Sequence, residues 1–351
     1  MTRPTVSLLM PILNEERNLP RSLGALLAQD YPKDRLELLI ADAGSADASL
    51  EIVDRYRSGL NIRVLSNAEL KEPEWGKAIA FRAAVGSYIQ CVDADMWPSS
   101  PKLIGRLVDV MESDLKLSGV AARYYGSSDL SVWSRFLSHD EFQRDPLFES
   151  LTPSMSDFVS EQHTGFDVCT FPTPRVPPMG QTTMYRRDDI DLSRWNGSFN
   201  DIDLVAFLVK EGKKRFGFLH DVGWVHEHCT SLAQLLRKRR RNLLGQSSSF
   251  LRAGAKRDFV WLDATNQSEV MALTRHVVAA NLLAPEFFRG VRRALQDRSA
   301  DHLLRPIVAL AIADSLILAL FRDEEGRKWI AGLLRDTFSA LRSTDKNLPS
   351  V

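Results

Sequence analysis

Apolar runs and amphipathic segments alternate along the first hundred residues. The apolar runs lie at residues 6–13, 36–41, 62–65 and 88–92. The segments between them, residues 19–27, 48–56 and 77–85, carry apolar side chains at helical spacing. Strands that are apolar on both faces and alternate with helices are typical of a parallel sheet covered by helices on both sides. The pattern therefore predicts an α/β fold for this part of the chain.

The pattern changes twice further along the chain. A helix at residues 102–117, a strand at 120–125 and a strand–helix–strand at 182–185, 202–210 and 222–225 continue the α/β pattern. Between them, residues 153–178 form a polar stretch with five prolines, which predicts a mobile loop that shapes an acceptor site. After Ser231 the spacing is helical to the end. We expect two domains, residues 1–230 and 231–351.

Composition narrows the class of protein. The 351 residues are 44% hydrophobic, enough for a full core, and the 45 basic residues equal the 45 acidic ones, which argues against a nucleic-acid partner. The three cysteines lie far apart, so a disulfide-stapled secreted domain is not expected. The apolar run at residues 6–13 has no signal-peptide cleavage site, and no run of 18 uncharged apolar residues follows. These features predict a cytoplasmic protein.

Chemically active side chains follow the predicted strands, where ligands bind in parallel sheets. Asp93 and Asp95 come directly after the strand at residues 88–92. Residues i and i+2 of an extended segment point to the same side, so both carboxylates can reach one point. Two such oxygens suit Mg²⁺ or Mn²⁺. Asp42 lies at the tip of another strand, beside Gly44 and Ser45, which can form a turn and a helix cap.

Three further features carry two interpretations each. Asp201 precedes a helical segment, either as a capping residue or as a general base. His226 and His228 could share one face of a strand, but further zinc ligands at suitable spacing are absent, so His226 is expected to face phosphates. Residues 231–257 contain eight basic side chains and no acidic one, which indicates either a solvated helix or a site for an anion.

Taken in order, these segments resemble family 2 glycosyltransferases of the GT-A fold, over roughly residues 5–245. The matching segments are residues 11–16 (PILNEE), 42–47 (DAGSAD), 86–95, 199–204 (FNDIDL), His226 and 238–245. Three of them depart from the family pattern. Ala43 replaces a second aspartate, Asn200 replaces a glutamate, and the last segment lacks the family's glutamine and tryptophan. The last departure disfavours a polysaccharide-extruding synthase and favours single addition.

The resemblance implies a transfer of a sugar from a nucleoside-diphosphate sugar, UDP being favoured, to an acceptor hydroxyl of unknown identity. It implies a divalent metal, Mg²⁺ or Mn²⁺, and one displacement with inversion. Asp201 would be the base. The residues expected to bind the nucleotide sugar are Pro11, Glu15, Asp42, Lys77, Asp93, Asp95, Arg239 and Arg241. The residues expected at the metal are Asp95, Asp93 and His226, the last also meeting the diphosphate.

Other interpretations stay open. Residues 41–45 loosely match the glycine-rich motif of methyltransferases that use S-adenosylmethionine, although the second glycine is missing. An inactive GT-A-like binding module is a third option. The apolar segment at residues 303–321 and the amphipathic one at 326–343 predict either packing on the catalytic domain, a homodimer or peripheral contact with the inner face of a membrane.

Overall fold

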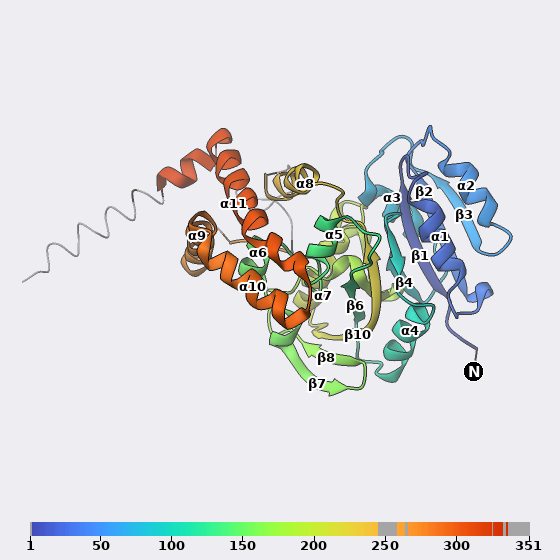
Figure 1. Cartoon of the computed structure of the whole chain (residues 1–351). Helices are drawn as coiled ribbons and strands as arrows, with labels where there is room; N and C mark the ends of the chain where they lie inside the picture. Colours follow the sequence, from blue (N-terminus) through green and yellow to red (C-terminus); the bar gives the residue numbers. More distant parts are fainter. Residues whose placement is uncertain (1, 245–257, 264–265, 325, 333–334, 336–351) are drawn as a thin grey trace, which may run out of the picture. The chain divides into compact units, whose positions relative to one another are not determined.

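The computed structural model describes residues 2–244, 258–263, 266–324, 326–332 and 335 (Figure 1). The chain divides into two compact units, one made of residues 1–144 and 152–230 and the other of residues 145–151 and 231–351. The segment at 145–151 therefore joins the second unit although it lies inside the first in sequence. Much of the predicted amphipathic segment at 326–343 lies outside the described residues.

The first unit is built on one mixed sheet. Its strands are β1 (Val6–Ile12), β2 (Leu36–Asp42), β3 (Asn61–Ser66), β4 (Tyr88–Cys91), β5 (Met96–Pro98), β6 (Gly119–Tyr125), β7 (Val159–His163), β8 (Phe166–Thr170), β9 (Thr183–Arg186) and β10 (Arg215–His226). They lie in the order β3-β2-β1-β4-β9-β6-β10-β8-β7, and β5 pairs with β10. Strands β1 to β4, β6 and β10 run in one direction, whereas β9, β8 and β5 are antiparallel to their neighbours. This is the GT-A fold predicted from the sequence.

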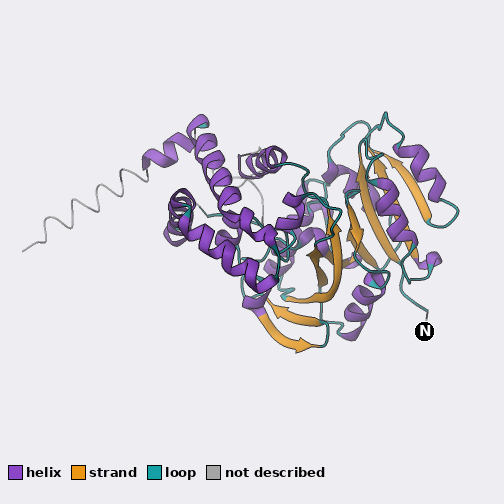
Figure 2. Ribbon diagram, viewed as in Figure 1, coloured by secondary structure: helices purple, strands orange, loops and turns teal. Residues whose placement is uncertain are grey.

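Helices cover both faces of this sheet, as Figure 2 shows. They are α1 (Leu19–Leu27), α2 (Ser49–Tyr56), α3 (Pro73–Ala83), α4 (Leu103–Ser113), α5 (Val132–Leu137) and α7 (Asp201–Lys210). Helices α1, α2 and α4 pack on the face of β1 that carries Leu8 and Met10, both fully buried. Helix α3 packs on the other face, because a Cβ on Gly76 would lie 3.1 Å from the Cβ of Pro11. Because successive side chains of β1 alternate between the two faces of the sheet, β1 contributes to the apolar core on each face.

The proline-containing stretch at residues 153–178 is partly regular structure. Strands β7 and β8 form a hairpin that extends the sheet beside β10, with Gly165 in the left-handed region (φ +85°) at its turn. The expectation of a continuous loop was wrong for this part. Strand β7 is an exposed, mostly polar edge strand, so it lacks the apolar alternation that identifies a strand in sequence.

The second unit is helical in its described part. Its helices are α6 (Pro146–Leu151), α8 (Leu232–Leu244), α9 (Gln267–Leu282), α10 (Ala284–Asp297) and α11 (Arg305–Arg322). Glu149 on α6 accepts from Arg293 and Arg305, both at 2.8 Å, so one carboxylate ties three helices together. The stretch Ala300–Arg322 is long and apolar enough to cross a membrane, and 50% of its apolar window is buried inside the protein. The sequence analysis identified most of this stretch as the apolar segment 303–321, but Arg305 and Asp314 interrupt it, so it contains no uncharged run of 18 residues.

The cysteines allow a first prediction. All three are buried, and burial raises the pKa of Cys169 to about 12 and that of Cys91 well above its usual value. Because the thiolate is the reactive form, the native protein at pH 8 is expected to react with a disulfide reagent far more slowly than the protein in denaturant. Counting released chromophore over time measures this. Rapid release of one equivalent from native protein would contradict it.

Candidate active site

The loops that follow β1 and β2 are bonded into one surface. The Asn14 side-chain oxygen accepts from the backbone of Ala46 at 2.8 Å, and the Asn14 backbone donates to the Ser45 hydroxyl at 3.0 Å. Asn14 adopts φ +56°, a conformation that asparagine tolerates better than most residues. The Glu16 carboxylate accepts from the backbone of Ala48 at 3.0 Å. The first two motifs therefore form a single unit at the carboxyl ends of these strands.

The Asp42 carboxylate accepts hydrogen bonds from the loop that follows it. It accepts from the backbone of Gly44 at 3.2 Å, from the backbone of Ser45 at 3.1 Å and from the Ser45 hydroxyl at 2.6 Å. Gly44 takes φ +89°, which only glycine adopts readily. Asp42 and Pro11 are half-buried at this edge of the sheet, and their contact with a base stays a prediction.

The ammonium group of Lys77 lies between two predicted site carboxylates. Its Nζ donates to Asp201 Oδ2 at 2.9 Å and lies 3.8 Å from Asp93 Oδ1. Helix α3 supplies Lys77, the first residue of α7 supplies Asp201, and the end of β4 supplies Asp93. The Lys77 side chain is only 7% exposed and that of Asp201 13%. Sequence segments more than a hundred residues apart thus meet at one point. The binding of Lys77 to ribose or phosphate remains a prediction.

Asp95 and His226 lie close together at the end of β10. His226 Nε2 is 3.4 Å from Asp95 Oδ1, and its Nδ1 is 2.7 Å from the Gln143 side-chain oxygen. The Gln143 amide nitrogen also donates to the His226 backbone carbonyl at 3.0 Å. Glu227 donates its backbone N–H to the Asp95 carbonyl at 3.0 Å, which fixes β10 against the aspartate loop. The imidazole is therefore oriented from two sides.

Two side chains of this site were missed by the sequence analysis. Gln181 donates to Asp93 Oδ2, and its oxygen accepts from the Tyr124 hydroxyl at 2.9 Å. The Tyr124 ring lies 5.4 Å from the His226 ring, centroid to centroid. Neither residue stands in a motif, and only the crossing of β6 beside β9 brings them to the aspartates. Their sequence positions carry no signal of this proximity.

The site holds an excess of negative charge. Burial raises the pKa of Asp93, and the Asp95 and Asp201 carboxylates raise it further while Lys77 acts against them. Burial also raises the pKa of Glu15, with Asp95 and Asp93 adding to the effect. For Lys77, burial lowers the pKa, but the charges of Asp201 and Asp93 outweigh it and leave the pKa well above its usual value. Lys77 thus compensates Asp201 and Asp93, while Asp95 and Glu15 add further negative charge nearby.

This excess fits a divalent cation. Asp93 and Asp95 offer carboxylate oxygens and His226 an imidazole nitrogen, a ligand set suited to Mn²⁺ or Mg²⁺. Buried like charges are unfavourable without a compensating cation, and the burial-raised pKa of Tyr124, which Asp93, Asp95 and Asp201 raise further, shows the same negative field at a neutral group. The chemistry of these three residues suits the metal that the resemblance implies, and their joint coordination of it stays a prediction.

The two predicted arginines lie in the second unit. Arg239 is 6% exposed, donates to the fully buried Asp145 and holds its guanidinium 4.8 Å from the centre of the Phe148 ring. Arg241 is exposed on α8. Within its unit Arg239 therefore joins α8 to α6, a role that the basic run did not indicate. The binding of either arginine to a diphosphate remains a prediction.

Gly180 supports Asp201 by having no side chain. It begins a short 3-10 helix, Gly180–Thr182, and a Cβ at this position would lie 1.9 Å from the carbonyl oxygen of Asp201. Real Cβ atoms do not approach so closely, so the substitution Gly180→Ala must push the start of α7 away. We expect it to lower activity at least tenfold and stability by about 1–3 kcal/mol, the range for overpacking. Initial rates and urea unfolding measure the two effects.

The control is Gly24→Ala in α1. A Cβ there would meet only the Tyr56 hydroxyl at an ordinary 3.6 Å. Because alanine favours a helix interior over glycine by about 1 kcal/mol, this variant is expected to keep its activity and gain slightly in stability. Equal activity of both variants would show that the position of Asp201 does not depend on Gly180.

Comparisons with known proteins indicate the family of the first part of the chain. Residues 7–175 match the profile of the family described as glycosyl transferase family 2. Poly(ribitol-phosphate) beta-N-acetylglucosaminyltransferase TarS of Staphylococcus aureus is 32% identical over 124 residues, 33% of this chain and 22% of TarS. Glycosyltransferase AglE of Haloferax volcanii is 28% identical over 138 residues, 36% of this chain and 45% of AglE. The matches span less than half of either relative.

A solved structure shares the fold. The mannosyltransferase PcManGT from Pyrobaculum calidifontis, in complex with GDP-Man and Mn²⁺, superposes with a TM-score of 0.53 at 18% identity, covering 92% of this chain and 89% of that one. At this identity the likeness concerns the fold. It extends over both units of the chain described above.

Proposed function

We propose that the chain is a glycosyltransferase, since residues 7–175 match glycosyl transferase family 2, and that it moves a hexose from a nucleoside-diphosphate sugar to an acceptor hydroxyl with the help of a divalent metal. One observation carries the proposal: Asp93 and Asp201 meet at the buried ammonium of Lys77, and Asp95, two residues from Asp93, meets His226. UDP is the favoured nucleotide. The PcManGT complex with GDP-Man makes GDP its competitor.

The chemistry assigned to Asp201 is that of a general base. Its carboxylate takes the proton of the acceptor hydroxyl as the acceptor oxygen bonds to the anomeric carbon, and the bond from that carbon to the diphosphate oxygen breaks. One displacement of this kind inverts the anomeric configuration. Lys77 holds the Asp201 carboxylate by a charge-assisted hydrogen bond at 2.9 Å, so the base is oriented before substrate enters.

The leaving diphosphate requires positive charge. A divalent cation held by Asp93, Asp95 and His226 would supply it by stabilising the negative charge that develops on the diphosphate oxygens. The chain's own residues contribute orientation: Gln181 bonds one oxygen of Asp93, and Gln143 fixes the imidazole of His226.

Thermal shift measurements test the proposal. The full chain is screened with UDP, GDP and S-adenosylmethionine, each with and without Mn²⁺ or Mg²⁺. We expect stabilisation by a nucleoside diphosphate that depends on the metal, and hydrolysis of the matching nucleotide sugar. Stabilisation by S-adenosylmethionine alone would favour a methyltransferase instead. Nucleotide binding without any hydrolysis or transfer would indicate an inactive binding module.

We also propose that the second unit contacts the cytoplasmic face of an anionic membrane. On α10, Phe288 and Leu295 are 68% and 76% exposed, and the exposed Arg292 lies between them at helical spacing. A face that combines apolar and basic side chains is typical of an interfacial helix. Co-sedimentation with phosphatidylglycerol vesicles at low salt tests this, with neutral vesicles as the control. A concentration-dependent mass without vesicle binding would favour a homodimer.

A further inference from the structure

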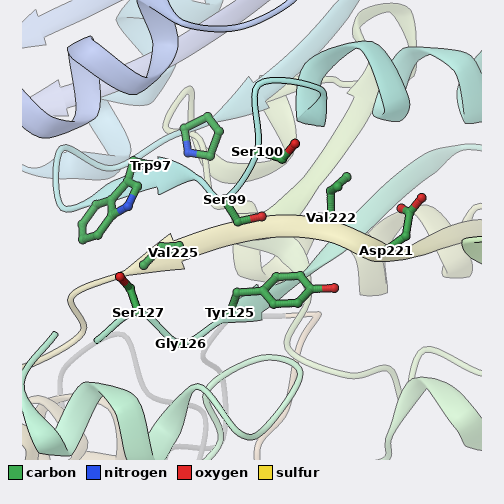
Figure 3. Close-up of a pocket in the computed structure, with 10 residues that line it drawn as sticks. Trp97, Ser99, Ser100, Tyr125, Gly126, Ser127, Asp221, Val222 and Val225 are labelled. Atoms are coloured by element: carbon green, nitrogen blue, oxygen red, sulfur yellow. The ribbon is translucent and has the colours of Figure 1, made fainter. Parts of the chain in front are cut away.

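A cavity of the first unit lies beside the loop that carries Asp93 and Asp95. It has a volume of about 540 Å³ and is lined by Trp97, Pro98, Ser99, Ser100, Tyr125, Gly126, Ser127, Asp221, Val222 and Val225 (Figure 3). This size falls within the range of about 300–1,000 Å³ typical of small-molecule sites. None of the residues assigned above to the nucleotide, the metal or the base lines it.

The sheet register separates this cavity from the catalytic cluster. Val225 of β10 lies opposite Trp97 of β5 and Tyr125 of β6, so the three side chains form a row on one face. His226, the next residue of β10, points to the other face, because successive side chains of a strand alternate. The cavity and the imidazole at Asp95 therefore lie on opposite faces of the same three strands.

The lining combines aromatic rings with neutral hydroxyls. Trp97 and Tyr125 supply ring surface, and Ser99, Ser100 and Ser127 supply hydroxyl groups. The Ser99 oxygen accepts from the backbone of Gly223 at 3.0 Å, which leaves its O–H available as a donor. Figure 3 shows Trp97 on β5 and Tyr125 on β6, the two strands that pair with this end of β10, and Ser99 beside β10 between them. Proteins recognise sugars in this way. The apolar C–H face of the sugar ring packs on aromatic side chains, and the sugar hydroxyls form hydrogen bonds with polar groups.

Two ion pairs position the charged and aromatic groups at the ends of the cavity. Arg21 places its guanidinium 4.4 Å from the centre of the Trp97 ring and also pairs with Asp129. Arg106 binds the Asp221 carboxylate at 2.9 Å. The described residues that line the cavity include no lysine or arginine, and the arginines that contact them already have partners: Arg21 pairs with Asp129, Arg106 with Asp221, and Arg123 lies 5.1 Å from the centre of the Tyr125 ring. A neutral ligand fits better.

From these observations we propose that the cavity is a second carbohydrate site, which holds a neutral saccharide unit of the acceptor or product on the face of the sheet opposite His226. Trp97 stacks on the sugar ring, and Asp221 and Ser99 bond its hydroxyls. The inference rests on the proposed glycosyltransferase function. Trp97 follows Asp95 by two residues, so one wall of the cavity continues directly from the loop that carries the aspartates.

Saturation-transfer NMR of the full chain with cellobiose, chitobiose and mannobiose tests the proposal. We expect saturable binding of at least one disaccharide that persists in saturating UDP and Mn²⁺. Trp97→Ala is expected to weaken this binding about tenfold, the effect of losing one aromatic stacking partner. Asp221→Ala, at an exposed position that does not threaten the fold, is expected to weaken it severalfold. Phe288→Ala removes an exposed aromatic ring elsewhere and should leave binding unchanged.

Three results would overturn the inference: no saturable binding of any of the three disaccharides, displacement of the disaccharide by UDP and Mn²⁺, or binding unaffected by both Trp97→Ala and Asp221→Ala. Metal-dependent stabilisation by nucleotide, measured on the same samples, separates this failure from failure of the proposed function. If nucleotides bind and disaccharides do not, only the second site is wrong. If wild-type protein binds no nucleotide, the proposed function fails as well.

Discussion

Asp201→Asn is expected to lower the rate of transfer by about 10²–10⁴-fold, the contribution of a positioned general base. Asparagine has the shape of aspartate and keeps an oxygen that can accept from the Lys77 ammonium, as Asp201 does at 2.9 Å. It cannot take the acceptor proton. Binding of the nucleotide should change little, because the metal ligands assigned to Asp93, Asp95 and His226 are untouched. The rate is measured as release of nucleoside diphosphate, and binding as metal-dependent thermal stabilisation.

The control for Asp201→Asn is Asp188→Asn. Asp188 is exposed and lies in a short 3-10 helix of the same unit, so it undergoes the same chemical change without contact to the site. It is expected to keep wild-type rate and binding. If Asp201→Asn also stays fully active, Asp201 is not the base. If it loses nucleotide binding together with activity, its role is to shape the donor site.

The sequence predicted the parts of the site that stand in order at strand ends. Asp93 and Asp201 could be expected near each other. Asp93 follows a predicted strand, Asp201 precedes a predicted helix of the same α/β unit, and ligands bind at the carboxyl ends of the strands in such units. Their link through Lys77 could not, since α3 shows no sign in the sequence of which partner its lysine meets. Tyr124 and Gln181 escaped prediction for a similar reason. Their contact depends on β9 running antiparallel between β4 and β6.

Local charge was harder to interpret than local apolarity. The basic stretch at residues 231–257 suggested an anion site, yet Arg239 is buried against Asp145, a residue 94 positions earlier in the chain. A buried ion pair of this kind leaves no pattern in either segment. The overall neutrality of the chain likewise conceals the excess of carboxylates around Asp93. Charge assignments from sequence therefore need the tertiary partner, as did the short strand β5, whereas the assignment of β1 to β4 did not.

Lys77→Met is expected to be the most destabilising single change in the site. Methionine is close to lysine in length, but it leaves the half-buried Asp201 and Asp93 carboxylates beside each other without their buried ammonium. Removal of one partner from a buried ion pair costs about 3–5 kcal/mol of unfolding free energy. Urea unfolding followed by circular dichroism measures the loss. Transfer activity should fall as well, because the base loses its orienting hydrogen bond.

Two companion measurements make this prediction specific. Lys213→Met removes the partner of Asp189 in an ion pair whose lysine is 38% exposed, and it is expected to cost at most about 1 kcal/mol. The double variant Lys77→Met/Asp201→Asn removes one of the two uncompensated charges, so it should be more stable than Lys77→Met alone. If Lys77→Met is as stable as Lys213→Met, or if the second substitution adds to the loss, then charge compensation at Asp201 and Asp93 does not explain why this lysine is buried.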